Sequence, residues 1–195
     1  MQYQAIVIGT SAGGLNALKV LFSLLSNDFS IPILVVQHIS SHSDNYLTTY
    51  LNNLCSLNIK EADDKEKIKP GYVYFSPPNF HMMVEDDKSI SFSVDQKVNF
   101  ARPSIDVLFE TAVYAYCPAL IGIVLTGANN DGAKGLKLIK DNGGLAIVQN
   151  PKTAEAKAMP QEAIKASKTN NILELEKIVE LLNKLDKDQK RNIIN

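Results

Sequence analysis

Short apolar runs that alternate with helical patterns constrain the fold of this chain more than any other feature. Apolar runs at 3–9, 31–38, 119–127 and 144–149 are bounded by turn residues. Between the first two, apolar residues recur at helical spacing over 14–26. Strands that alternate with helices favour a mainly parallel sheet with helices on both faces. We therefore predict a doubly wound α/β fold.

The middle of the chain departs from this alternation. Three short strands are expected at 71–77, 80–85 and 89–94, joined by Pro-Pro and Asp-Asp turns, which indicates a small antiparallel excursion. Further helices are expected at 43–54 (with Ser43 or Asp44 as N-cap), 104–117, 132–142, 160–167 and 173–185.

The chain is expected to form one domain. Its 195 residues are enough for one sizeable core, and no repeat or Gly-, Ser- or Pro-rich linker divides them. We expect a single catalytic-type domain over 1–195, with its core at about 3–185 and a charged C-terminal tail at 186–195.

Composition and charge exclude several classes of protein. The formal net charge of −1 lacks the excess of basic residues that is typical of nucleic-acid-binding proteins. No apolar run approaches the ~20 residues of a membrane helix, and the N-terminus lacks the pattern of a secretory signal. Cys55 and Cys117 have no metal-type spacing and are interpreted as reduced structural thiols. The sequence thus predicts a cytoplasmic protein with no nucleic-acid partner and no membrane insertion.

Three chemically active side chains follow predicted parallel strands. Ser11 comes after the strand at 3–9, His38 ends the strand at 31–38, and Asp131 follows the strand at 119–127. In an open parallel sheet, ligands bind beyond the carboxyl ends of the strands. We therefore expect these three side chains to converge at one edge of the sheet.

The stretch Gly9-Thr10-Ser11-Ala12-Gly13 fits the G-x-S-x-G nucleophile elbow in a strand–turn–helix context. In this interpretation Ser11 is the nucleophile, His38 takes its proton, and Asp131 orients the imidazole. The backbone amide of Ala12, at a helix start, is the first candidate for an oxyanion donor. This chemistry requires no metal and no cofactor.

Other interpretations of the same residues remain open. The glycine turn also suits phosphate binding at a helix N-terminus, although Ser11 replaces the second glycine of G-x-G-x-x-G and no Walker lysine follows. His38 could be a buried structural histidine, and Asp131, within "NDG", could be an ordinary turn or N-cap residue. His81 is expected to pack or to form local hydrogen bonds.

Six segments together resemble one family, the catalytic domain of chemotaxis protein-glutamate methylesterases (CheB-type). They are, in order, "IGTSAGG" (8–14), "VVQHI" (35–39), "GYVYFSPPNFHMMV" (71–84), "RPSIDVLFETA" (102–112), "GIVLTGANNDGAKGL" (122–136) and "AMPQEAI" (158–164). The resemblance extends to about residue 185. It implies a doubly wound α/β domain that hydrolyses methyl esters of receptor glutamates, and in some members also deamidates receptor glutamines.

The resemblance also implies roles for single residues. The family's triad falls on Ser11, His38 and Asp131, and its second oxyanion amide falls on Ala128. Where the family usually has Met-Gly, this chain has Ala128-Asn129, so a changed pocket shape is expected. That departure keeps an alternative open, a non-catalytic module that binds a receptor or a methyltransferase.

The resemblance implies an acidic protein substrate, the cytoplasmic helices of methyl-accepting chemoreceptors. Thr10 and Arg102 are candidate substrate-binding residues, although Arg102 could equally hold a neighbouring carboxylate. Family members typically carry an N-terminal receiver domain, whereas this sequence opens within two residues of its first predicted strand. If the chain is complete, control by phosphorylation within the same polypeptide is not available, and a cognate methyltransferase or a separate regulator is an expected partner.

Overall fold

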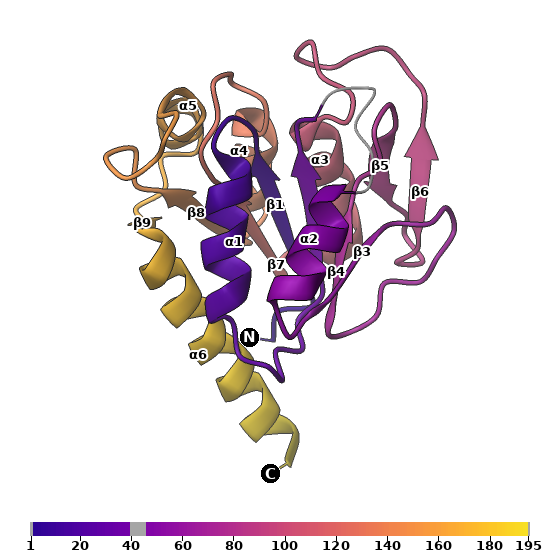
Figure 1. The fold of residues 1–195 in the computed structure, drawn as a ribbon, viewed down its shortest axis with the longest axis vertical. Helices are drawn as coiled ribbons and strands as arrows, with labels where there is room; N and C mark the ends of the chain where they lie inside the picture. Colours follow the sequence, from indigo (N-terminus) through magenta and orange to yellow (C-terminus); the bar gives the residue numbers. More distant parts are fainter. Residues whose placement is uncertain (1, 40–45, 195) are drawn as a thin grey trace.

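The computed structural model describes residues 2–39 and 46–194 and contains a seven-stranded parallel sheet (Figure 1). The strand order in this sheet is β3-β4-β2-β1-β7-β8-β9. Its strands are β1 (Ala5–Thr10), β2 (Ile33–Gln37), β3 (Asn58–Glu61), β4 (Tyr72–Phe75), β7 (Leu120–Val124), β8 (Leu145–Gln149) and β9 (Ile172–Leu173). The doubly wound α/β fold expected from the alternation is confirmed.

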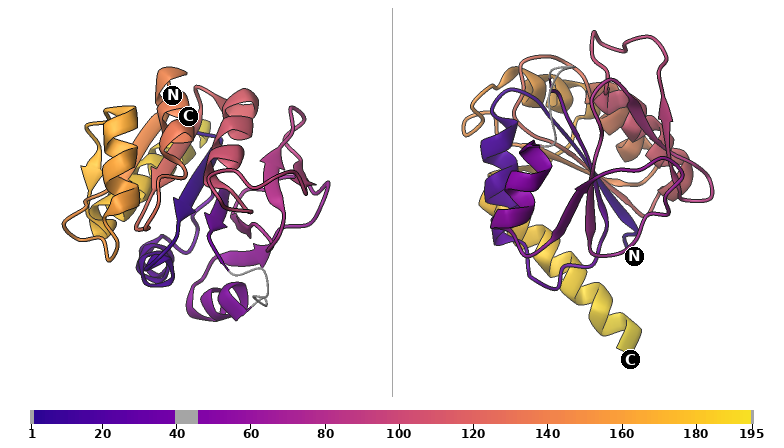
Figure 2. Two further views of the ribbon diagram at one scale, coloured as in Figure 1. Left: turned by 90° about the horizontal axis from the view of Figure 1, so that it is seen from above. Right: turned by 45° about the vertical axis from the view of Figure 1, so that its right-hand side comes forward.

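Helices cover both faces of the sheet (Figure 2). One face packs against α1 (Gly14–Leu24), α2 (Tyr46–Leu54) and α6 (Leu175–Ile194). The other packs against α3 (Ile105–Tyr116), α4 (Ala133–Asp141) and α5 (Ala158–Ser167). A separate antiparallel pair, β5 (His81–Val84) and β6 (Ile90–Ser93), packs beside α3 on this second face.

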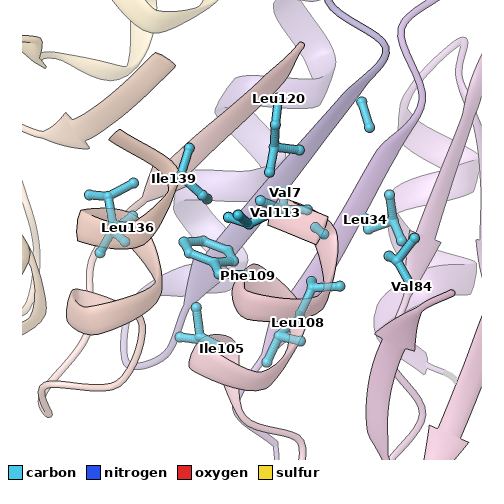
Figure 3. Close-up of a cluster of buried hydrophobic side chains, with 14 of the residues drawn as sticks. Val7, Leu34, Val84, Ile105, Leu108, Phe109, Val113, Leu120, Leu136 and Ile139 are labelled. Carbon is cyan, nitrogen blue, oxygen red and sulfur yellow. The ribbon is translucent and has the colours of Figure 1, made fainter. Parts of the chain in front are cut away.

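The central strand β1 is buried along its whole length. Ile6 and Ile8 belong to the core on the α1 side, whereas Val7 belongs to the core on the α3 side. Val7 lies among Phe109 and other apolar side chains of α3 (Figure 3). Because both faces of β1 are buried, its sequence is a continuous apolar run and does not alternate between apolar and polar residues.

The winding of the chain reverses beside β1. From β1 the chain passes through α1 to β2 on one side, and it later returns to β7 on the other side of β1. The carboxyl ends of β1 and β7 therefore flank the point where the strand order switches, the usual ligand site of such sheets.

The middle of the chain corrects one prediction. The 71–77 strand was expected among the antiparallel pieces, but β4 pairs in parallel with β2 and β3 inside the main sheet. The antiparallel excursion is confined to β5 and β6. The edge strand β3 was not predicted, because within "NIKE" only Ile59 is buried and no apolar alternation marks it.

The end of the chain also differs from the expectation. The helix expected at 173–185 is α6, and it runs on through most of the segment expected as a charged tail. Asp186 in that segment is only 2% exposed and accepts a hydrogen bond from the Ser30 hydroxyl. The predicted caps Ser43 and Asp44 lie outside the described residues. None of the helices in the described part has the length and apolarity of a membrane span.

Candidate active site

The turn after β1 holds Ser11 in a fixed backbone position. The Ser11 amide donates to the Thr126 carbonyl (2.9 Å), and the Gly14 amide donates to the Ser11 carbonyl (2.9 Å). Gly13 follows with φ 78°, a backbone conformation that glycine adopts without steric cost. Ser11 is half-buried in the turn between the end of β1 and the start of α1, at the carboxyl end of the central strand.

Gln37, the last residue of β2, ties this turn to the next strand end. Its amide nitrogen donates to the carbonyls of Ser11 and His38, both at 2.9 Å. The His38 amide in turn donates to the Thr10 carbonyl (3.0 Å). The backbones of Ser11 and His38 are therefore joined through one side chain, a role that the sequence did not reveal.

His38 and Asp131 form a hydrogen-bonded pair. Nε2 of His38 lies 2.8 Å from Oδ2 of Asp131. The His38 side chain is 13% exposed and that of Asp131 is fully buried. An ionised carboxylate can only accept, so Nε2 carries the proton and Nδ1 is left as the acceptor nitrogen of the neutral ring.

The carboxylate of Asp131 lies at the start of helix α3. Its oxygens accept from the amides of Ile105 (2.6 Å) and Asp106 (3.2 Å), the Ser104 hydroxyl (2.9 Å) and the Asn99 amide group (2.8 Å). Burial alone would raise the pKa of Asp131, but the hydrogen bonds from His38, Asn99 and the Ile105 amide outweigh it and hold the pKa below its usual value. Asp131 is therefore a stable anion.

The interpretation of Asp131 as a cap of its own helix is not supported by the geometry. The N-cap of α4 is Gly132, in a left-handed conformation and without a side-chain cap hydrogen bond. The carboxylate of Asp131 instead meets the free amides of α3, where the helix dipole favours negative charge. Asp131 is thus tied to His38 and to α3 at once.

The serine is not hydrogen-bonded to this pair. Among the hydrogen bonds between described residues, none joins the Ser11 hydroxyl to His38. Nδ1 of His38 instead lies 3.3 Å from the amide nitrogen of Asn129, whose oxygen accepts from the Asp131 amide (3.1 Å). The side chain of Asn129 therefore bridges the two loops that carry His38 and Asp131.

The two expected oxyanion donors lie on exposed turns. Ala12 and Ala128 are both exposed, and neither amide donates to any other residue that the structure describes. Thr126, the second residue after β7, connects the two turns, because its hydroxyl donates to the Ala12 carbonyl (2.8 Å). Both amides are therefore free to bind an anionic oxygen from outside.

The remaining candidate residues have structural contacts. Thr10, expected at the substrate site, is fully buried and is not among the residues that line the cavity described below; its hydroxyl donates to the Thr126 carbonyl (2.9 Å) and so joins the end of β1 to the turn after β7. His81 is 1% exposed, in agreement with the packing role expected for it, but its hydrogen bonds are not local in the sequence: its ring accepts from the Ser104 amide (3.2 Å) and bonds to the Gln96 carbonyl (3.1 Å). Arg102 donates to the carbonyls of Val94 and Asp95 and pairs with no carboxylate among the described residues.

A cavity of about 430 Å³ opens beside the His38–Asp131 pair. His38 and Asn129 line one side of it, and the connection between β6 and α3 lines the other with Lys97, Phe100 and Arg102. Within the described residues no group of three potential metal ligands lies together. The cavity can hold a side chain of a larger substrate next to the imidazole.

The fold and the site together define a parallel α/β protein with a serine turn and a histidine–aspartate pair at the switch point of its sheet. The chain belongs to the CheB methylesterase family, whose sequence model matches residues 6–182. It is similar to the crystal structure of the Thermotoga maritima CheB methylesterase catalytic domain, with a TM-score of 0.89 and 32% identity. That match covers 95% of this chain and all of the other.

Named relatives agree with the family. A protein of Leptospira interrogans, named a protein-glutamate methylesterase/protein-glutamine glutaminase, is 56% identical over 96% of this chain and 97% of its own length. A protein of the same name from Archaeoglobus fulgidus is 38% identical over 82% of this chain but only 46% of its own length. Relatives therefore include one of similar length and one about twice as long.

Proposed function

We propose that this protein is a serine esterase that removes methyl esters from glutamate side chains of chemoreceptors. The hydrogen bond between His38 and Asp131, beside the Ser11 turn, carries the proposal. Membership of the CheB methylesterase family and the names of the relatives support the substrate class. The same names support hydrolysis of glutamine side chains as a second activity.

In the proposed reaction Ser11 Oγ attacks the ester carbonyl and its proton passes to Nδ1 of His38. Asp131, hydrogen-bonded to Nε2, stabilises the imidazolium that forms. The amides of Ala12 and Ala128 bind the oxyanion. The imidazolium then protonates the departing methoxide, and methanol leaves. A water molecule, deprotonated by His38, hydrolyses the acyl-serine to a glutamate carboxylate and restores Ser11.

This sequence of steps requires a change at Asn129. In the structure its amide group faces Nδ1 of His38, the nitrogen that must accept the serine proton. We infer that Asn129 holds the ring in place before substrate binds, and that Ser11 replaces it at Nδ1 in the reacting complex. Catalytic hydrogen bonds that are long in a free enzyme commonly form only in the complex with substrate.

The partners follow from the proposed substrate. The chain would act in the cytoplasm as a single catalytic domain, on the cytoplasmic helices of methyl-accepting chemoreceptors. A cognate methyltransferase or a separate regulator is a further expected partner.

The proposal predicts that the purified chain releases methanol from a methyl-esterified chemoreceptor fragment. Gas chromatography quantifies the methanol, and peptide mass spectrometry locates each new glutamate carboxylate. Heat-denatured protein and an unmethylated fragment are the controls. Binding of the fragment without methanol release above these controls would favour the non-catalytic alternative.

A further inference from the structure

Phe100 is exposed and strained at the rim of the cavity. It is 98% exposed and has φ 63°, a conformation in which a bulky side chain is a true outlier. It forms a two-residue turn with Asn99 (φ 51°), closed by hydrogen bonds in both directions between Val98 and Ala101 (3.1 and 2.9 Å). Glycine is the residue that such a turn favours at this position. The turn alone therefore gives no reason for an aromatic side chain.

Asn99 anchors this turn to the catalytic pair. Its amide nitrogen donates both to Oδ1 of Asp131 and to Oδ2 of Asp106, each at 2.8 Å. Asp131 in turn holds His38. The connection between β6 and α3, at the top of Figure 1, is therefore fixed above the carboxyl ends of the strands, with Phe100 next to the cavity.

The charged side chains around Phe100 are mainly cationic. Lys97 is exposed and has no hydrogen bond or ion pair to a described residue, and the guanidinium of Arg102 donates to the carbonyl oxygens of the same connection. Asp95, the acidic residue of this connection, accepts a hydrogen bond from the Ser93 hydroxyl. The rim thus combines an exposed aromatic ring with two cations that pair with no carboxylate in the described part of the chain.

We propose that the Val98–Ala101 turn recognises the protein substrate, an acidic segment that carries the esterified glutamate. This inference rests on the proposed function. Phe100 packs on the apolar surface of that segment, while Lys97 and Arg102 lie near its unesterified glutamates. Aromatic residues, phenylalanine included, and arginine are enriched in protein–protein interfaces, and cations at the rim add steering and specificity.

The test measures binding separately from turnover. Fluorescence anisotropy gives the Kd of a labelled, partly methyl-esterified chemoreceptor fragment for the Ser11→Ala protein, with and without Phe100→Gly. We expect Phe100→Gly to raise the Kd about tenfold, an effect of the size that marks the important contact residues of an interface. Val94→Ala is the matched control, because Val94 is 66% exposed on the same connection but does not line the cavity.

A structural role for Phe100 predicts a different result. Glycine tolerates a positive φ, so Phe100→Gly should not lower the melting temperature if the ring serves only binding. An unchanged Kd, a rise equal to that of Val94→Ala, or no binding to the parent protein would overturn the inference. If the Kd rises selectively but the wild type releases no methanol, the proposed function fails while the recognition surface stands.

The contribution of Lys97 to binding is tested by its dependence on salt. Lys97→Ala should raise the Kd less than Phe100→Gly does, and added salt should remove the difference between Lys97→Ala and its parent. A Lys97→Ala effect that persists in high salt would contradict the assignment of Lys97 to the acidic groups of the segment.

Discussion

Ser11→Ala is expected to lower kcat for methanol release by a factor on the order of 10⁶, the loss seen when the nucleophile of a serine hydrolase is removed. The substitution deletes the oxygen that forms the acyl bond. The hydroxyl makes no hydrogen bond to another described residue, and the backbone bonds of Ser11 to Thr126 and Gly14 do not depend on its side chain. Activity is measured by gas chromatography of methanol.

The fold of this variant should be unchanged. Its far-UV circular dichroism and melting temperature should match those of the wild type. Ser23→Ala, at an exposed position on helix α1, which follows the Ser11 turn, is the matched control and should retain full activity. If Ser11→Ala retained turnover within tenfold of the wild type, direct attack by water would replace the acyl-serine mechanism.

Asp131→Asn is expected to lower kcat by a factor of about 10⁴, as the same change does in another serine hydrolase by selecting the wrong imidazole tautomer. The introduced amide can no longer accept at both positions, so the proton on Nε2 of His38 loses its partner. Hydrogen bonds from Ile105, Ser104 and Asn99 also converge on this carboxylate, so a lower melting temperature is expected as well.

Asp106→Asn separates the two effects. Asp106 is also buried at the start of α3 and accepts from Asn99 and the Gly135 amide, but it does not contact His38. Kinetics are compared at a temperature where circular dichroism shows both variants to be folded. Equal losses of kcat in the two variants would mean that Asp131 acts only through the fold.

The sequence predicted the parts of the molecule that depend on local pattern. The strands before Ser11, His38 and Asp131 are β1, β2 and β7, and the parallel sheet brings their ends to one edge. Apolar runs and turn residues were sufficient for this, because buried parallel strands are apolar throughout. The family resemblance was confirmed by the match over 6–182.

The pairing of one of the short strands in the middle of the chain was predicted wrongly. A four-residue strand between turn residues looks the same whether it pairs in a hairpin or in a parallel sheet, so β4 was placed with β5 and β6. The edge strand β3, which pairs with β4 on the side away from β2, has a single buried residue and no apolar pattern that would predict a strand. Which strands pair depends on contacts between segments far apart in the sequence, and the hydrophobic periodicity of one segment does not determine these contacts.

The supporting residues of the site were missed for the same reason. The Gln37 side chain donates to the carbonyl of Ser11, 26 positions away, and Asn99 lies 32 positions from Asp131. Asn129 stands out in the sequence only as a departure from the family's Met-Gly, whereas its contact with Nδ1 of His38 appears only in the folded chain. Such hydrogen bonds form only when folding brings the strand ends together, so no short sequence motif predicts them.

The most direct test of the central claim is titration of the purified chain with a serine-reactive fluorophosphonate, followed by peptide mass spectrometry. The account predicts one adduct per chain, located on Ser11, and a large loss of labelling rate in Asp131→Asn because His38 then activates the serine poorly. Absence of labelling, or labelling spread over other serines at the same rate as Ser11, would contradict the assignment of Ser11 as an activated nucleophile.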